Sequence, residues 1–194
     1  EKQQGIDMVA GYVEPHARPK TAALLNGLEV LPTREVFYNG MILDEFDIGM
    51  ALKRKPQLIL VDELAHTNAE GCRHAKRYQD IKELLNAGID VYTTVNVQHI
   101  ESLNDTVASI TGIMVHERIP DSVFDNADQV ELIDIEPQDL INRMNTGNVY
   151  RQTQAKQAVE NFFTIENLTA LREISLRRCA DRVNILTENA RIKN

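Results

Sequence analysis

The sequence has only two cysteines and no long apolar run, and these shortages argue against several classes of protein. Cys72 and Cys179 stand far apart and belong to no paired motif. A disulfide framework or a four-cysteine zinc site is therefore not expected, and a reducing, cytoplasmic compartment fits best. No apolar stretch approaches the ~18 residues of a membrane-spanning helix, and the first residues contain no signal-peptide core. We therefore expect no direct insertion of this chain into a membrane.

Positive charge is also scarce, and it is unevenly spread. The net charge is -8, yet residues 151–194 carry 8 Lys/Arg against 5 Asp/Glu, which leaves 13 against 24 for residues 1–150. A main body this acidic argues against binding to nucleic acid, because a grip on the phosphate backbone needs a basic face. The basic C-terminal segment could still contact an acidic partner.

Predicted strands and helices alternate along the chain. Short apolar runs predict strands at residues 7–13, 57–63, 89–95 and 128–135. Segments of helical periodicity with recognisable end signals predict helices at residues 44–56, 73–88, 96–112 and 136–147. The two middle strands are nearly continuous in apolar or β-branched residues, as expected when helices cover both faces of a parallel sheet. The pattern predicts an α/β fold with a mostly parallel sheet.

Two segments depart from this alternation. Asn39-Gly40, between two short β-prone runs, predicts a tight hairpin over residues 35–43. Beyond Tyr150 the strands stop, and residues 153–163 and 166–194 predict two helices. We therefore expect an α/β domain over residues 1–150 and a helical extension over residues 151–194 that leads toward a following domain.

Two consecutive acids, Asp62 and Glu63, directly follow the aliphatic run at residues 58–61. Ligands of open parallel sheets bind at the carboxyl ends of the strands. An aliphatic strand that ends in Asp-Glu is the Walker B pattern of P-loop NTPases, in which the aspartate helps to hold Mg²⁺ and the glutamate polarises a water. The alternative is that any strand must leave the core through polar residues, and the two acids alone do not decide between these interpretations.

Polar residues also follow the next predicted strand. Gln98 and His99 lie just beyond the same expected sheet edge, where such NTPases often place an amide that senses the terminal phosphate. Asn96 is better explained as the cap of the following helix. We therefore take Asp62, Glu63, Gln98 and His99 as candidate nucleotide-binding residues, with Asp62 as the candidate metal ligand and no residue as catalytic.

The sequence has no phosphate-binding loop. Such a loop needs Gly-Lys followed by Ser or Thr, so that backbone N–H groups cradle the phosphates and the lysine neutralises them. None of the nine glycines is followed by lysine. The sequence thus has the metal side of a nucleotide site without the phosphate side, which suggests a piece of a longer protein. We expect Mg²⁺-ATP to bind that intact protein, and this fragment to bind it weakly or not at all.

Three further polar clusters have alternative explanations. The first cluster is His66, Cys72 and His74. Its spacing fits no common zinc pattern and indicates residues of a loop. The second cluster, at the start of the helix predicted at 73–88, is Arg73, Lys76 and Arg77. Positive charge at this end opposes the helix dipole. The cluster therefore indicates either a contact with an anion or a partner, or a solvated turn that pairs with Asp80 and Glu83. In the C-terminal helix, Arg178 and Arg182 share a face with Arg177 nearby, which allows an interdomain contact, although a solvated face is the simpler interpretation. Leu168, Leu171 and Ile174 are predicted to pack in the core.

The block at residues 62–112 resembles one family closely. With residues 11–30 and 167–183, it is similar to the N-terminal cytoplasmic domain of the KdpD sensor histidine kinases. These are membrane-bound, osmosensitive and potassium-responsive kinases of bacterial two-component systems. The resemblance covers essentially the whole chain. The departures are Glu70 and Cys72, in a loop where the family usually shows Ala-Pro-Gly-Ser-Arg-His.

The resemblance implies a P-loop-NTPase-like, three-layer α/β domain that lacks its first strand and P-loop. Such a domain binds ATP and modulates the balance of kinase and phosphatase activity in the distant catalytic core. The Walker B acids of the family fall on Asp62 and Glu63, and a Walker A loop is expected upstream. The alternatives are a slow Mg²⁺-dependent ATPase and an interaction scaffold that binds no nucleotide.

The resemblance also implies where the domain lies and what it contacts. Its partners are the other cytoplasmic domains of the same kinase, with a homodimer formed through the parent protein. Its location is the cytoplasmic face of the plasma membrane, to which segments outside this sequence anchor the parent.

Overall fold

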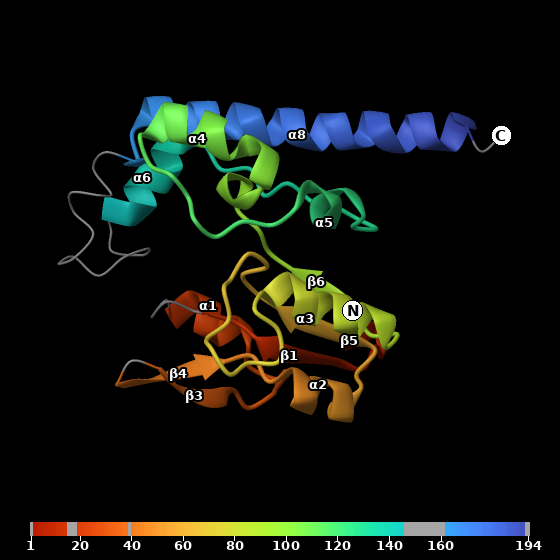
Figure 1. Ribbon diagram of the computed structural model, residues 1–194. Coiled ribbons are helices and arrows are strands. Elements are labelled where there is room, and N and C mark those ends of the chain that lie inside the picture. Colours follow the sequence, from red (N-terminus) through yellow and green to blue (C-terminus); the bar gives the residue numbers. More distant parts are fainter. Residues whose placement is uncertain (1, 15–18, 39, 146–161, 193–194) are drawn as a thin grey trace. The chain divides into compact units, whose positions relative to one another are not determined.

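The computed structural model describes residues 2–14, 19–38, 40–145 and 162–192 (Figure 1). The chain forms two compact units, residues 1–95 and 96–194. The predicted boundary between residues 150 and 151 lies outside the described residues and stays a prediction. None of the helices within the described ranges is both long enough and apolar enough to cross a membrane.

A four-stranded parallel sheet forms the centre of the first unit. Its strands are β1 (Met8–Tyr12), β2 (Glu29–Val30), β5 (Leu58–Val61) and β6 (Asp90–Thr93), in the order β2-β1-β5-β6. Every neighbouring pair runs parallel. The predicted α/β class and three of the predicted strands are confirmed, whereas the two-residue β2 was not expected.

The two middle strands of this sheet supply the core. Val9, Ile59 and Val61 are at most 1% exposed. A Cβ atom on Gly11 would lie 2.6 Å from Ile59 Cδ1 and 2.9 Å from the ring of Phe46, so only glycine allows this close approach of β1 to its neighbours. Burial of this aliphatic layer fixes the register of β1 and β5, and therefore fixes which residues stand at their carboxyl ends.

Three helices accompany the sheet: α1 (Pro19–Leu24), α2 (Ile48–Arg54) and α3 (Arg77–Asn86). Helix α2 begins after Asp47, whose side chain accepts a hydrogen bond from Met50 N at 2.9 Å. Helix α3 packs against β6 and α2 and is followed by Gly88 in the left-handed conformation (Figure 1). The helices predicted at 44–56 and 73–88 are therefore confirmed, but each begins four residues later than predicted.

The predicted hairpin is also confirmed. Strands β3 (Arg34–Tyr38) and β4 (Met41–Glu45) pair antiparallel, with Tyr38 opposite Met41 across the turn at Gly40. The ladder extends two residues beyond the predicted range at its carboxyl end. Its last residue, Glu45, is only 3% exposed, so the hairpin carries a carboxylate into the interior of the unit.

The second unit contains helices and no ladder among its described residues. The helices are η2 (Val97–His99), η3 (Glu101–Leu103), α4 (Asn104–Thr111), α5 (Asp121–Asp125), α6 (Pro137–Asn145) and α8 (Ile165–Ile192). The strand predicted at residues 128–135 is wrong. Ile133 is 73% exposed, and the segment is held instead by the ion pairs of Asp134 and Glu136 with Arg172 of α8, at 2.6 and 2.8 Å.

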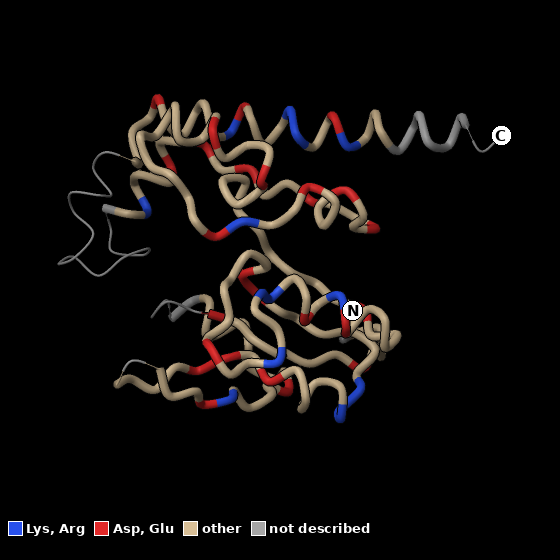
Figure 2. Tube along the Cα trace, in the orientation of Figure 1, with Lys and Arg blue, Asp and Glu red and all other residues tan. Residues whose placement is uncertain are grey.

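Helix α8 confirms the helix predicted from residue 166, whereas the helix predicted at 153–163 falls almost wholly outside the described residues. Leu168 and Leu171 are buried, as predicted. Figure 2 marks the basic positions along α8, and three of them, Arg177, Arg178 and Arg182, differ in exposure. Arg178 and Arg182 are 8% and 6% exposed, so the prediction of a solvated face is wrong for both. Arg177 alone among the three is largely exposed.

Arg178 and Arg182 are buried because α8 packs on the segment around α5. Arg178 Nη2 lies 2.6 Å from Asp125 Oδ1 and 3.4 Å from Asp121 Oδ1, and its guanidinium carbon lies 4.8 Å from the centre of the Phe124 ring. Arg182 donates to the carbonyl oxygen of Ala127. These contacts join α8 to residues 121–127 within the second unit.

Candidate functional site

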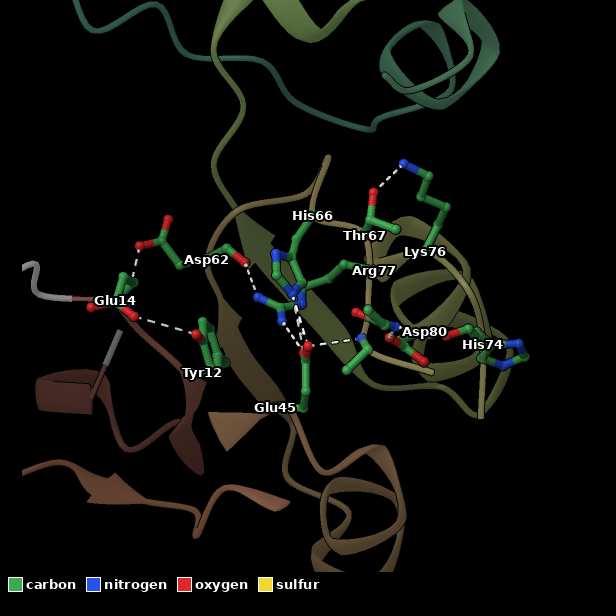
Figure 3. A network of polar contacts seen from close by, with 12 residues as sticks. Tyr12, Glu14, Glu45, Asp62, His66, Thr67, His74, Lys76, Arg77 and Asp80 are labelled. Atoms are coloured by element: carbon green, nitrogen blue, oxygen red, sulfur yellow. Dashed lines mark hydrogen bonds and ion pairs between the residues drawn. The ribbon is translucent and has the colours of Figure 1, made fainter. Parts of the chain in front are cut away.

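Asp62 and Glu63 follow β5 directly, at the carboxyl end of an inner strand of the parallel sheet. Figure 3 shows Asp62 and its contact with Glu14. Asp62 is half-buried. Its Oδ1 accepts hydrogen bonds from Glu63 N at 3.0 Å and from the Thr94 hydroxyl, and its Oδ2 accepts from Glu14 N at 3.4 Å. None of these three donors carries a charge. The side chain is therefore held in place by groups from the ends of β1, β5 and β6 that do not neutralise it.

Glu63 has a left-handed backbone with a φ of 57°. A residue other than glycine adopts this conformation at a cost of about 1–2 kcal/mol. Hydrogen bonds hold the turn in spite of that cost, because Glu63 N also donates to Thr94 Oγ1 at 3.3 Å and Leu64 N donates to Thr94 O at 2.9 Å. A strained residue beside a half-buried carboxylate, at the carboxyl end of a parallel strand, is typical of a functional site.

A buried ion pair between Glu45 and Arg77 supports this turn (Figure 3). Arg77 is fully buried, and its Nη2 lies 3.1 Å from Glu45 Oε2. Its Nη1 donates to the carbonyl oxygen of Asp62 at 3.2 Å, and its guanidinium carbon lies 4.1 Å from the centre of the Tyr12 ring. Arg77 is thus neither the anion contact nor the solvated turn residue that the sequence predicted.

Glu45 has further partners in the loop after β5. His66 Nε2 lies 3.1 Å from both carboxylate oxygens, and Ala69 N donates to Oε1 at 2.9 Å. Burial opposes ionisation of Glu45, but the hydrogen bonds from His66 and Ala69 and the charge of Arg77 outweigh it and hold the pKa of this carboxyl below its usual value. Burial raises the pKa of Tyr12 to about 12, in spite of the nearby Arg77 charge.

Helix α3 fixes the rest of this loop. Asn68 Nδ2 donates to Asp80 Oδ2 at 2.6 Å and to the carbonyl oxygen of His74 at 3.0 Å. Glu83 lies 2.8 Å from His74 Nε2 and 2.5 Å from Arg73 Nη2. Lys76 Nζ lies 2.5 Å from the Thr67 hydroxyl. Of the two interpretations of the basic cluster at residues 73–77, pairing with Glu83 is therefore correct for Arg73.

His66, Cys72 and His74 lie in the loop between β5 and α3, and each has different neighbours. Each histidine contacts its own glutamate, and burial raises the pKa of the Cys72 thiol. In the described ranges, no three His, Cys, Asp or Glu side chains are grouped closely enough to hold a metal ion. Glu70, the other departure from the family loop, is exposed.

Asp80→Asn is expected to stabilise the fold at neutral pH. Asp80 is 2% exposed, and its burial raises the pKa of its carboxyl above 3.8 in spite of the hydrogen bond from Asn68. Ionised Asp80 is thus less favourable in the folded state than in the unfolded state. As pH falls through the raised pKa, the folded state gains its proton first, so the stability deficit shrinks and is gone below pH 3.8. The asparagine variant keeps an acceptor for Asn68 and removes the charge.

Urea denaturation at neutral pH and near pH 3.5 checks this expectation. The variant should exceed wild type in unfolding free energy at neutral pH, and the gap should close in acid. The same substitution at the exposed Asp90 should change the unfolding free energy by less than about 0.5 kcal/mol at either pH. A variant less stable than wild type at neutral pH would show that Asp80 is needed in its ionised form.

Gln98 and His99 belong to η2 of the second unit. Both are half-buried, and His99 Nδ1 lies 2.8 Å from the carbonyl oxygen of Glu117. Asn96 precedes η2 at the capping position, but its side chain makes no cap hydrogen bond. The role of Gln98 and His99 in nucleotide binding stays a prediction.

The oxygen-rich edge around Asp62 fits Mg²⁺ that arrives with a nucleotide. Mg²⁺ is usually held by one or two carboxylates, with phosphates and waters as its remaining ligands. Asp62 offers a carboxylate whose hydrogen-bond partners are neutral, next to the Thr94 hydroxyl and to Glu63.

Comparison with known proteins decides the family. The model of the KdpD family, described as the osmosensitive K⁺ channel His kinase sensor domain, matches residues 1–183. The chain belongs to this family. The KdpD resemblance carried by residues 62–112, 11–30 and 167–183 is therefore confirmed.

Curated KdpD relatives agree with this assignment. Sensor protein KdpD of Clostridium acetobutylicum is 61% identical over 191 residues, which are 98% of this chain and 21% of the relative. Sensor protein KdpD of Escherichia coli K12 is 58% identical over 183 residues, 94% of this chain and 20% of the relative. A Mycobacterium tuberculosis relative of the same name is 52% identical over 180 residues, 93% and 21% respectively. The chain spans about a fifth of the length of these relatives.

Proposed function

We propose that this chain is a regulatory Mg²⁺-ATP-binding domain of a potassium-responsive sensor histidine kinase. ATP occupancy at the carboxyl edge of its parallel sheet shifts the balance of kinase and phosphatase activity in the remainder of the protein. The sensor role is supported by the family description and by the names of the relatives. The partners are the other domains of the same kinase, at the cytoplasmic face of the membrane, with a homodimer formed through the parent protein.

The position of Asp62 is the observation that carries the nucleotide part of this proposal. Its carboxylate stands at the carboxyl end of an inner parallel strand, held by three neutral donors. In the proposed complex Asp62 would hold Mg²⁺, Thr94 would keep the carboxylate oriented, and Glu63 would supply a second carboxylate next to Asp62. The bound cation supplies positive charge that neutralises the phosphates.

The proposal requires a phosphate-binding loop from outside these 194 residues, in a P-loop-like arrangement. No glycine of the sequence is followed by lysine, so the chain has no Walker A lysine to neutralise a phosphate. We therefore expect the 194-residue chain alone to bind Mg²⁺-ATP with a Kd above about 1 mM. A micromolar Kd for this chain by calorimetry would show that the loop is not required.

Asp62→Asn is expected to weaken Mg²⁺-ATP binding by the full-length protein about tenfold or more, because an amide is a poorer ligand for Mg²⁺ than a carboxylate. Isothermal titration calorimetry with and without Mg²⁺ measures this change. Asp90→Asn, which removes an exposed carboxylate at the start of β6, should bind like wild type. Equal affinities of the Asp62 variant and wild type would remove the metal role of Asp62.

A slow Mg²⁺-dependent ATPase is a second candidate, favoured by the left-handed backbone of Glu63 next to the proposed metal ligand. In that case Glu63→Gln abolishes ATP turnover and leaves Mg²⁺-ATP binding intact. Binding without turnover in wild type supports the purely regulatory role. No binding by the full-length protein leaves an interaction scaffold as the remaining function.

A further inference from the structure

We infer that Arg77 is a positioning residue for the Asp62-Glu63 turn, acting through the backbone carbonyl of Asp62. The inference rests on the proposed function, because the task of the turn is to present Asp62 to Mg²⁺-ATP. The sequence singled out Arg77 only as part of a basic cluster at the start of a predicted helix, and its partner Glu45 is 32 positions away.

The location of Arg77 is unfavourable for a charge. It is the first residue of α3, where the helix dipole repels a cation, and it is completely buried. A buried ion pair is generally no more stabilising than an apolar pair of similar volume. Stability alone therefore does not explain the pair, whereas a donor with a fixed direction does.

The guanidinium is held by three groups. Glu45 accepts from Nη2 at 3.1 Å, the Tyr12 ring lies 4.1 Å from its central carbon, and Nη1 is directed at the carbonyl oxygen of Asp62 at 3.2 Å. Figure 3 shows Arg77 between Asp62 and Glu45. A planar guanidinium fixed at one nitrogen and across one face has little freedom at the other nitrogen. The carbonyl of Asp62 is thus fixed by a rigid donor.

The same pair also fixes the far side of the turn. Glu45 accepts from Ala69 N and contacts His66, and Arg77 N donates to the carbonyl oxygen of His66 at 3.1 Å. Residues 62–69 are therefore attached to Arg77 and Glu45 at their beginning, middle and end. Because Glu63 is held in a strained left-handed conformation, loss of the donor at Asp62 lets this turn relax and moves the carboxylate.

Two variants separate positioning from stability. Glu45→Gln keeps Arg77 and its hydrogen bond to Asp62 but leaves the buried guanidinium without a charged partner. Arg77→Met/Glu45→Gln removes the buried charge together with the donor, and glutamine still offers an acceptor to Ala69 N. The double variant should therefore be the more stable of the two in urea denaturation. It should nevertheless bind Mg²⁺-ATP about 10–100-fold more weakly than Glu45→Gln when both are measured in the full-length protein.

If Arg77 positions the turn, the double variant is thus the more stable of the two but binds Mg²⁺-ATP more weakly. If affinity follows stability across the two variants, the inference is overturned and Arg77 is a structural residue. Hydrogen–deuterium exchange of the segment at residues 62–66 gives a readout that needs no nucleotide. It should be faster in the double variant than in Glu45→Gln, and equal exchange also overturns the inference. If full-length wild type binds no Mg²⁺-ATP, the proposed function fails, and the exchange result alone decides whether Arg77 positions the turn.

Discussion

Glu45→Ala is expected to lower the free energy of unfolding of the chain by about 3–5 kcal/mol, because it leaves a buried cation without its partner. Arg77 is fully buried, so water cannot replace the lost carboxylate. The substitution also leaves Ala69 N without its acceptor. Urea denaturation at neutral pH, monitored by circular dichroism, measures the loss.

Glu35→Ala is the matched control for this experiment. Glu35 lies on the same hairpin, is exposed, and stands opposite Asp44 in the ladder. Its removal should change the unfolding free energy by less than about 0.5 kcal/mol. A loss of similar size in both variants would mean that the hairpin, and not the buried pair, is responsible.

Acid should narrow the difference between wild type and Glu45→Ala. The pKa of Glu45 lies below its ordinary value of 4.5 in the folded chain, so its ionised form stabilises the fold. This contribution is fully present above about pH 4.5 and is lost as pH falls through the lowered pKa. A difference that stays constant into strong acid would show that lost packing, and not lost charge, destabilises the variant.

The sequence predicted the position of Asp62 and Glu63 because their place depends on a local pattern. An aliphatic run of four residues followed by two acids places those acids at a strand end in any parallel sheet. Their partners come from distant segments. Thr94 follows the neighbouring strand, and Arg77, which donates to the carbonyl oxygen of Asp62, is paired with Glu45, a residue that the sequence placed in the helix predicted at residues 44–56.

The wrong predictions have one physical cause, which is that tertiary contacts overrode local pattern. Residues 128–135 alternate like a strand, but no neighbouring strand pairs with them in the described part of the second unit. Arg178 and Arg182 were predicted to be solvated because charged residues of a helix are usually exposed. Their burial depends on acidic and carbonyl groups at residues 121–127, more than 50 positions away.

Arg178→Ala is expected to lower the free energy of unfolding of the second unit by about 2–3 kcal/mol. It removes a charge-assisted hydrogen bond of 2.6 Å to Asp125 and the contact with the Phe124 ring. The loss is smaller than that for Glu45→Ala, because Asp121 and Asp125 are about a third exposed and water can solvate them. Faster hydrogen–deuterium exchange at residues 121–127 should accompany it, since Arg178 joins this segment to α8.

Arg177→Ala is the matched control, since it removes the same side chain one position earlier on the same helix. Arg177 is 72% exposed and pairs with Glu173 one turn before it at 2.6 Å. Such a surface pair contributes less than about 0.5 kcal/mol, so the control should unfold like wild type and leave exchange at residues 121–127 unchanged. Equal effects of the two substitutions would mean that helix propensity or net charge, and not the buried contact, holds α8 on residues 121–127.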